Sequence, residues 1–216
     1  MIKACIFDLD GVIVDTAKFH FLAWQELAHS LGVEFTEEHN ENLKGVGRME
    51  SLEYILELGS VVMDQESKLS LANSKNEQYK KLILDISPED ILPGVKEFIE
   101  ELREAGLKIA LGSSSKNARP VLDYLQLKQF FDVIIDGTDI SRSKPDPQVF
   151  EMGAEALNIA ASEIVVFEDA QAGIDAARAG GFRCIGIGRS EDLSNADHVM
   201  EGFSGFSIDR LSNLMN

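Results

Sequence analysis

Two aspartates near the start of the chain, Asp8 and Asp10, have the residue type and spacing for chemistry. They follow a short apolar run that is typical of a strand, and Gly11 after them permits a sharp turn. Because side chains alternate between the two faces of a strand, residues two apart, such as Asp8 and Asp10, would point to the same face as long as the strand continues. Two close carboxylates repel each other unless a cation or a shared proton offsets their charge. Mg²⁺, which proteins hold with carboxylates and substrate phosphate oxygens, explains the pair and predicts a phosphoryl-transfer site.

Further polar residues come where other predicted strands end or in loops before helices. Ser113 ends one apolar run, Glu168 and Asp169 close another, and Lys144 precedes a helix. Ligands gather outside the carboxyl ends of parallel strands, so these side chains are expected to converge. They can supply the nucleophile, metal ligands, phosphate donors and proton carrier that phosphoryl transfer needs. Taken singly, each of these features also fits an ordinary turn, helix start, loop or surface lysine. Their occurrence together, in this order along the chain, favours a phosphoryl-transfer site.

The composition is that of an acidic globular protein. Hydrophobic residues make up 44% and charged residues 26% of the 216 positions, which is ordinary for a soluble domain. The net charge of −17 argues against nucleic-acid and membrane partners, because both need basic surface. Cys5 and Cys184 lie in apolar runs and are expected to be buried free thiols. The start of the chain does not resemble a signal peptide and no run reaches membrane-spanning length, so a cytoplasmic protein is expected.

The apolar patterns divide the chain into two parts. Residues 15–87 are helical in character, and we interpret Trp24 in this part as a packing residue. Strands and helices alternate afterwards, with strands predicted at 107–112, 132–136, 164–167 and 184–188, and with Asp146 and Pro147 predicted as N-cap and first turn of a helix. This pattern predicts an α/β fold with a doubly wound parallel sheet. The core domain would comprise residues 1–14 and 88–216, with a small all-helical cap domain, residues 15–87, inserted after the first strand.

The ordered motifs resemble those of the haloacid dehalogenase superfamily. They are Asp8-Leu9-Asp10-Gly11-Val12, a strand-end serine, Lys144-Pro145 and Glu168-Asp169. The resemblance covers essentially the whole chain and implies a Rossmann-like core with a helical cap. More closely, the chain is similar to the β-phosphoglucomutase group, on the strength of the cap segment 44–48 and of Ser115-Lys116-Asn117. Gly47 is a departure, since the resemblance leads us to expect a serine there.

The resemblance implies a role for each matching residue. Asp8 would be the nucleophile that becomes an aspartyl phosphate, and Asp10 the general acid and base. Mg²⁺ would be held by Asp8, Glu168, Asp169 and the backbone carbonyl of Asp10. The transferred phosphoryl group would be bound by Ser113, Ser114 and Lys144. A phosphate at the far end of the sugar would be bound by Arg48, Ser115, Lys116 and Asn117. The sugar, Asp10 or the cap hinge would be contacted by Thr16, His20, Lys44, Gly45 and Lys75.

The activity implied by the resemblance is that of an isomerase in carbohydrate metabolism. It would interconvert β-D-glucose 1-phosphate and D-glucose 6-phosphate through β-glucose 1,6-bisphosphate, with Mg²⁺ as cofactor and as a monomer. A sugar-phosphate phosphatase with the same nucleophile is the first alternative, and a second phosphate site at Arg48 would separate the two. The other alternative is a signalling receiver domain, which would carry its phosphoacceptor on a later strand and have no helical insertion.

Overall fold

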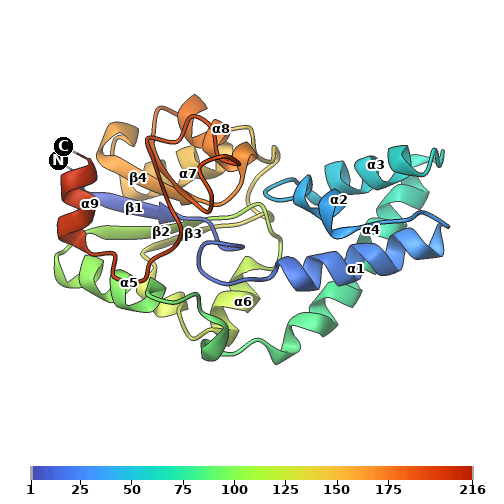
Figure 1. Ribbon diagram of the computed structural model, residues 1–216, viewed down its shortest axis with the longest axis horizontal. Coiled ribbons are helices and arrows are strands. Elements are labelled where there is room, and N and C mark those ends of the chain that lie inside the picture. Colours follow the sequence, from blue (N-terminus) through green and yellow to red (C-terminus); the bar gives the residue numbers. More distant parts are fainter. Residues whose placement is uncertain (1, 216) are drawn as a thin grey trace.

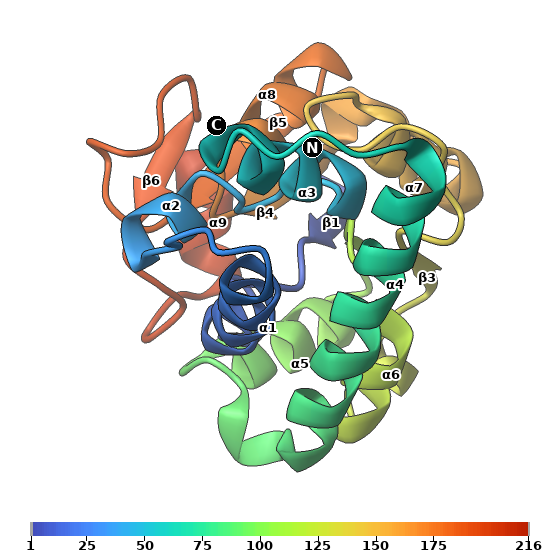
Figure 2. The same cartoon turned by 90° about the vertical axis from the view of Figure 1, so that its right-hand side faces the viewer.

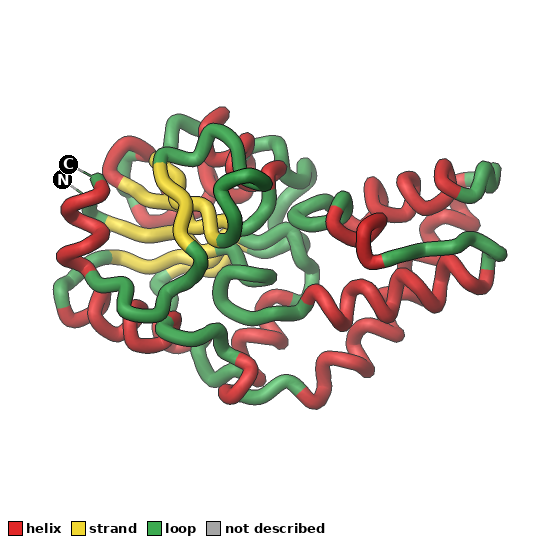
Figure 3. The backbone as a smooth tube through the Cα atoms, viewed as in Figure 1, coloured by secondary structure: helices red, strands yellow, loops and turns green. Residues whose placement is uncertain are grey.

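A parallel six-stranded sheet forms the centre of the protein, whose computed structural model describes residues 2–215 (Figures 1 and 3). The strand order is β3-β2-β1-β4-β5-β6, so β1 lies in the middle. Each pair of neighbours is parallel. The strands are β1 (Ala4–Phe7), β2 (Lys108–Gly112), β3 (Val133–Ile135), β4 (Ile164–Glu168), β5 (Arg183–Ile187) and β6 (His198–Met200).

Helices cover both faces of the sheet. Alternate side chains of β1 point to opposite faces: Cys5 and Phe7 pack in one hydrophobic cluster, and Ala4 and Ile6 in another. The first cluster includes side chains of α5 (Val95–Glu104), α6 (Ala118–Tyr124) and α9 (Ile208–Leu214). The second includes side chains of α7 (Gln148–Leu157) and α8 (Gln171–Ala179), which lie above the sheet in Figure 1. Strands buried on both faces explain the continuous apolar runs, and the α/β prediction is confirmed.

A helical unit follows β1 and extends beyond the carboxyl ends of the strands (Figure 1). Its main helices are α1 (Ala17–Ser30), α2 (Glu37–Glu41), α3 (Arg48–Leu58) and α4 (Gln65–Leu82). It has its own hydrophobic cluster, which includes Trp24, Leu52 and Ile55, so Trp24 does pack as predicted. In Figure 2, where this unit faces the viewer, β1 lies beyond α1, α3 and α4. We call this unit the cap, and the sheet with its flanking helices the core.

Three local predictions need correction. β1 ends at Phe7, so Asp8 and Asp10 follow the strand, and their placement depends on a turn in which Gly11 has φ +74°. The edge strand β6 was not predicted, because its sequence His-Val-Met has one β-branched residue and no apolar run like that of β3. The helix predicted from Asp146 and Pro147 begins at Gln148, although the Asp146 carboxylate still accepts a hydrogen bond from the Gln148 amide at 3.0 Å.

Both cysteines are buried and free, as predicted. Burial raises the pKa of both thiols, so they remain protonated and behave as core residues. Within residues 2–215, no helix combines the length and apolarity that crossing a bilayer requires.

Candidate active site

A cavity of about 300 Å³ lies between the cap and the carboxyl ends of the strands. Every site residue predicted from the sequence lines it, with the exception of Glu168. Glu168 is fully buried beneath the cavity at the end of β4. Residues that are far apart in the chain therefore meet at one place, which is where ligands bind in open α/β sheets.

Asp8 lies on the floor of this cavity, 3% exposed. Its backbone amide donates to the carbonyl of Phe167 at 3.0 Å, which continues the pairing of β1 with β4 and fixes the position of the carboxylate. Lys144 Nζ is 2.9 Å from Asp8 Oδ1 and also forms a short ion pair with Glu168. Burial alone would lower the pKa of Lys144, but the charges of Asp8 and Glu168 outweigh it and raise that pKa. Lys144 is therefore a fixed positive charge beside Asp8.

Asp8, Glu168 and Asp169 form a group of carboxylates that could hold a metal ion. One oxygen of each lies within 4.8 Å of the others. Burial raises the pKa of Asp169, and the negative charges of Glu168 and Asp8 raise it further. One lysine cannot neutralise three closely spaced carboxylates, of which Asp8 and Glu168 are buried and Asp169 is partly buried, and a hard divalent cation such as Mg²⁺ suits this all-oxygen donor set. A Cβ atom on Gly11 would overlap the Asp169 carboxylate. The close packing of the turn after β1 against Asp169 therefore requires glycine at position 11.

Asp10 faces the same cavity from the turn after β1. Thr16 Oγ1, at the N-cap of α1, donates a short hydrogen bond to its Oδ1 atom. Burial and the charge of Asp8 raise the pKa of Asp10 to about 7, although Thr16 and Lys144 act in the opposite direction. A carboxyl group with a pKa near neutrality can both give and take a proton at that pH. Asp10 thus has the properties of a general acid and base, and Thr16 fixes its orientation.

The loop after β2 supplies neutral hydrogen-bonding groups. Ser113 Oγ accepts from the Ser115 amide at 3.1 Å, and Ser115 Oγ accepts from the Asn117 amide at 3.2 Å. These bonds hold the loop in a compact turn against the sheet. Ser114 Oγ is buried and has no hydrogen-bond partner among the described residues. A buried hydroxyl without a partner costs free energy, and a polar ligand in the cavity would satisfy it.

A contact between cap and core surrounds Asn76 of α4. Its side-chain carbonyl accepts from Arg48 at 2.8 Å and from Asn117 at 2.8 Å, so one oxygen joins α3, α4 and the core loop before α6. Within residues 2–215 no carboxylate forms an ion pair with Arg48, and burial lowers the pKa of its guanidinium. Lys116 is exposed at the rim. Asn76 was not predicted as a site residue, because a single asparagine in a polar helix carries no pattern.

Lys75 and His20 form a buried polar pair on the cap side. Lys75 Nζ lies 3.1 Å from His20 Nδ1 and 4.2 Å from the centre of the Trp24 ring. A charged ammonium group can only donate, so His20 then accepts through Nδ1 and carries its proton on Nε2. That Nε2 is buried and has no partner among the described residues. Burial, with Lys75 and Arg48 nearby, lowers the pKa of His20, which leaves a neutral donor for a ligand in the cavity.

The charge on Lys75 destabilises the fold. Burial and the charge of Arg48 lower the pKa of Lys75 from 10.5 to about 7, while Asp10 opposes this shift. Between pH 7 and 10.5 the unfolded chain holds more protons on this residue, so stability rises with pH in that window. We expect Lys75→Met to increase the free energy of unfolding by about 2 to 3 kcal/mol more at pH 6 than at pH 9.

Denaturant titration of the ligand-free protein at the two pH values measures this difference. Lys80→Met on the same helix is the control, because the Lys80 side chain is half-exposed and its replacement should give the same change at both pH values. An equal effect of Lys75→Met at pH 6 and pH 9 would show that the buried lysine carries no such cost.

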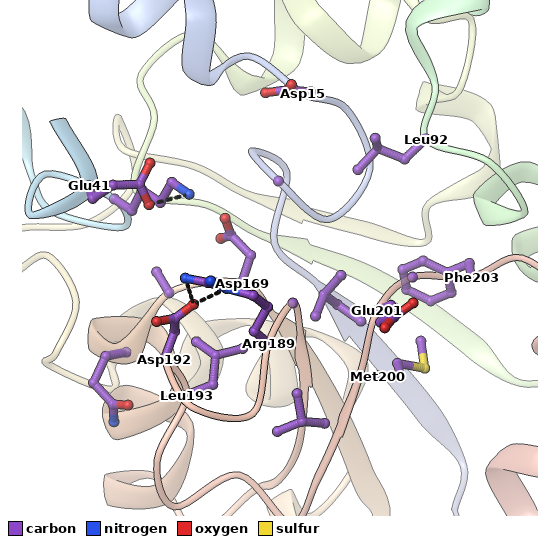
Figure 4. A pocket seen from close by; sticks show the side chains of 18 of the residues that line it. Asp15, Glu41, Leu92, Asp169, Arg189, Asp192, Leu193, Met200, Glu201 and Phe203 are labelled. Carbon is purple, nitrogen blue, oxygen red and sulfur yellow. Dashed lines mark hydrogen bonds and ion pairs between the residues drawn. The ribbon is translucent and has the colours of Figure 1, made fainter. Parts of the chain in front are cut away.

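A second, larger cavity of about 1410 Å³ adjoins the first through Gly11, Lys44, Val46 and Asp169. Figure 4 shows it from close by, with Asp169 between Glu41 of α2 and Arg189 of the loop after β5. Lys44 Nζ is 2.7 Å from a Glu41 carboxylate oxygen. Burial would lower the pKa of Lys44, but this hydrogen bond and the charges of Glu41, Asp169 and Asp15 raise it. Lys44 therefore brings a positive charge to the boundary between the two cavities.

Comparisons with known proteins show which family the chain resembles over its length. Residues 2–181 match the family of haloacid dehalogenase-like hydrolases. The chain is 39% identical to a β-phosphoglucomutase of Bacillus subtilis, covering 97% of this chain and 93% of that one. It is 34% identical to a phosphorylated carbohydrates phosphatase of Thermotoga maritima, covering 92% of this chain and 90% of that one. The crystal structure of a β-phosphoglucomutase from Clostridium difficile superposes with a TM-score of 0.97 at 40% identity, covering 100% and 98% of the two chains.

These relatives span nearly the full length of the chain, so the likeness includes both the cap and the core. They are named for phosphate transfer within a sugar phosphate and for phosphate removal from carbohydrates. Together with the matched family, they show that the chain belongs to the haloacid dehalogenase-like hydrolases and is related to their sugar-phosphate mutases and phosphatases.

Proposed function

We propose that this protein is a β-phosphoglucomutase, which interconverts β-D-glucose 1-phosphate and D-glucose 6-phosphate through β-glucose 1,6-bisphosphate. The observation that carries the proposal is the pair of cationic groups in one small cavity. Lys144 lies beside Asp8 on the core side, and Arg48, held by Asn76, comes from the cap. A bisphosphate has two dianionic ends, and arginine suits the one that is bound without reaction. We also propose that the cap domain comprises residues 15–87 and that the core domain comprises residues 1–14 and 88–216.

The chemistry follows from the groups around Asp8. An Asp8 oxygen forms a bond to phosphorus, and the bond from phosphorus to the sugar oxygen breaks while Asp10 gives that oxygen a proton. The free C1 or C6 hydroxyl of a glucose monophosphate then attacks the aspartyl phosphate, the bond from phosphorus to Asp8 breaks, and the hydroxyl gives its proton to Asp10. This step forms β-glucose 1,6-bisphosphate, which can return either of its phosphates to Asp8. Ser113, the Ser114 amide and Lys144 hold the phosphoryl oxygens. Asp8, Glu168, Asp169 and the Asp10 carbonyl would hold Mg²⁺, which supplies positive charge against the phosphoryl group when bound.

The remaining predicted residues would contact the rest of the sugar phosphate. His20 Nε2, left without a protein partner, and the cations Lys44 and Lys75 suit hydroxyl groups, and Gly45 leaves room beside them. Arg48 with Ser115, Lys116 and Asn117 suits the distant phosphate. Thr16 connects Asp10 to α1, so movement of the cap and orientation of the proton carrier are coupled. This coupling would favour a sugar acceptor over water, because the proton carrier is in place only when the cap is closed.

A coupled assay tests the proposal. The purified protein is given β-glucose 1-phosphate, a trace of β-glucose 1,6-bisphosphate and Mg²⁺, and glucose 6-phosphate and free phosphate are both measured. Formation of glucose 6-phosphate well above phosphate release supports the mutase. Phosphate release with no glucose 6-phosphate would overturn it in favour of the second candidate, a sugar-phosphate phosphatase, which the likeness to the Thermotoga maritima phosphatase favours.

Arg48→Ala separates these two candidates further. Loss of a charged hydrogen-bonding group to phosphate costs about 1.5 to 3 kcal/mol, so transfer to the sugar acceptor should fall roughly 10- to 100-fold. Phosphate release should fall much less, because water needs no second phosphate site. Arg210→Ala, an exposed arginine of α9, serves as the matched control and should leave both rates unchanged. Equal losses of transfer and release in Arg48→Ala would contradict a special role for this side chain in acceptor binding.

A further inference from the structure

Gly47 lies buried where the cap meets the core. It is the N-cap residue of α3, with φ −68° and ψ 157°, so its backbone conformation is open to any amino acid. Serine is at least as good as glycine at an N-cap, so neither backbone strain nor helix capping calls for glycine here. The reason for a glycine at this position must be the space around it.

Ser143 of the core occupies that space. A Cβ atom on Gly47 would overlap Ser143 Oγ and would lie 3.0 Å from Ser143 Cβ. It would also overlap a carboxylate oxygen of Glu50, but Glu50 is a long exposed side chain that can move away. Rotation can move the serine hydroxyl, whereas its Cβ atom is tied to the backbone. A side chain at position 47 therefore has to move the cap backbone away from the Ser143 loop by a few tenths of an ångström.

Each side of this contact directly precedes a cation of the cavity. Arg48 follows Gly47, and Lys144 follows Ser143. Lys144 cannot shift freely, because it is fully buried and bound to both Asp8 and Glu168. Arg48 is held by Asn76, which also binds Asn117 of the core. The separation of residues 47 and 143 therefore determines the span between the two cations.

We propose that the Gly47–Ser143 contact is the stop that ends cap closure, and that Gly47 is a positioning residue that sets the span available to a sugar phosphate. This inference rests on the proposed function for its substrate, a hexose phosphate held at both ends. With the contact intact, the cap excludes water from Asp8 and presents the sugar hydroxyl at the correct distance. With a side chain at position 47, the cap stops short and water reaches the phosphorylated aspartate.

Gly47→Ala should therefore lower the rate of transfer between sugar positions several-fold, up to about 10-fold, since misplacement of a reacting group by about 1 Å costs about 100-fold and the shift needed here is a fraction of that. The ratio of phosphate release to transfer should rise by a similar factor. Ser143→Gly removes both atoms of the core that the new Cβ atom would meet. The double variant Gly47→Ala/Ser143→Gly should thus recover most of the transfer rate relative to Ser143→Gly alone. Gly202→Ala is the control, because a Cβ atom there meets nothing within 4 Å.

A second measurement does not depend on turnover. Hydrogen exchange of the backbone amides in residues 43–51 should be faster in Gly47→Ala than in the wild type, and the double variant should restore the slower exchange. Recovery in both measurements supports the inference. A loss of transfer that persists in the double variant, or no change in exchange on Gly47→Ala, overturns it.

The two proposals can fail separately. A wild-type protein that only releases phosphate removes the mutase, while the exchange pattern of the three variants still decides whether the contact limits closure. Thermal unfolding of each variant shows whether it remains folded, and Gly47→Ser, which can cap α3, provides a second side chain at the same position if Gly47→Ala is unstable. Unchanged exchange in a folded Gly47→Ser variant would equally overturn the inference.

Discussion

Asp8→Asn is expected to abolish phosphoryl transfer and phosphate release together, with a loss on the order of 10⁴-fold or more. An amide has almost the same shape as a carboxylate, but its oxygen is too weak a nucleophile to form a phosphoenzyme. Lys144 retains Glu168 as a partner, so the ion pair that places the lysine survives. Acid-quenched protein after incubation with β-glucose 1,6-bisphosphate should carry a phosphoryl group in the wild type and none in the variant.

The same variant separates chemistry from folding. Replacing Asp8 removes one negative charge from a buried group that also contains Glu168 and Asp169. In the absence of divalent cations, the repulsion that remains is smaller, so Asp8→Asn should be at least as stable as the wild type. Asp209→Asn on the exposed side of α9 is a matched control that should keep full activity. Retained transfer in a folded Asp8→Asn variant would remove Asp8 as the nucleophile.

Residues at the ends of strands could be located from the sequence because apolar runs mark the strands clearly. β1, β2 and β4 are fully buried except at Lys108, and each run ends at a polar residue that the pattern picks out. Since parallel strands share one carboxyl edge, the convergence of Asp8, Ser113 and Glu168 followed from the order of elements alone. The helical cap was recognisable by the same logic, since residues 15–87 show no strand pattern.

Contacts between cap and core could not be predicted in this way. Asn76 joins Arg48 and Asn117, and Gly47 meets Ser143, but neither pair of partners shares a strand edge or a helix face. Such contacts depend on the angle at which the cap sits on the core, which local patterns do not specify. The position of Asp10 could be predicted from the sequence only in part. It lies in the cavity as expected, but through a turn held by Gly11 and Val14, since β1 ends before it.

Asp10→Asn is the second variant with a large expected effect. General acid and base catalysis contributes about 10²- to 10⁴-fold, and we expect transfer to slow by that factor. Asparagine can still accept the hydrogen bond from Thr16, so the turn and α1 should keep their positions. The Kd for β-glucose 1-phosphate, measured by calorimetry, should change by less than about threefold. A Kd that rises as steeply as the rate falls would make Asp10 mainly a binding group.

The pH dependence distinguishes a proton carrier from a group that only shapes the cavity. Burial and the charge of Asp8 raise the pKa of Asp10 to about 7, so the acid form predominates below that pH and the base form above it. Transfer needs the acid form when the first sugar oxygen leaves and the base form when the second attacks. The wild-type rate should therefore be highest near neutral pH and fall on both sides. In Asp10→Asn that maximum should disappear, because no proton remains to be exchanged at this position. If the variant is slow but keeps the wild-type profile, another group titrates near neutrality and carries the proton.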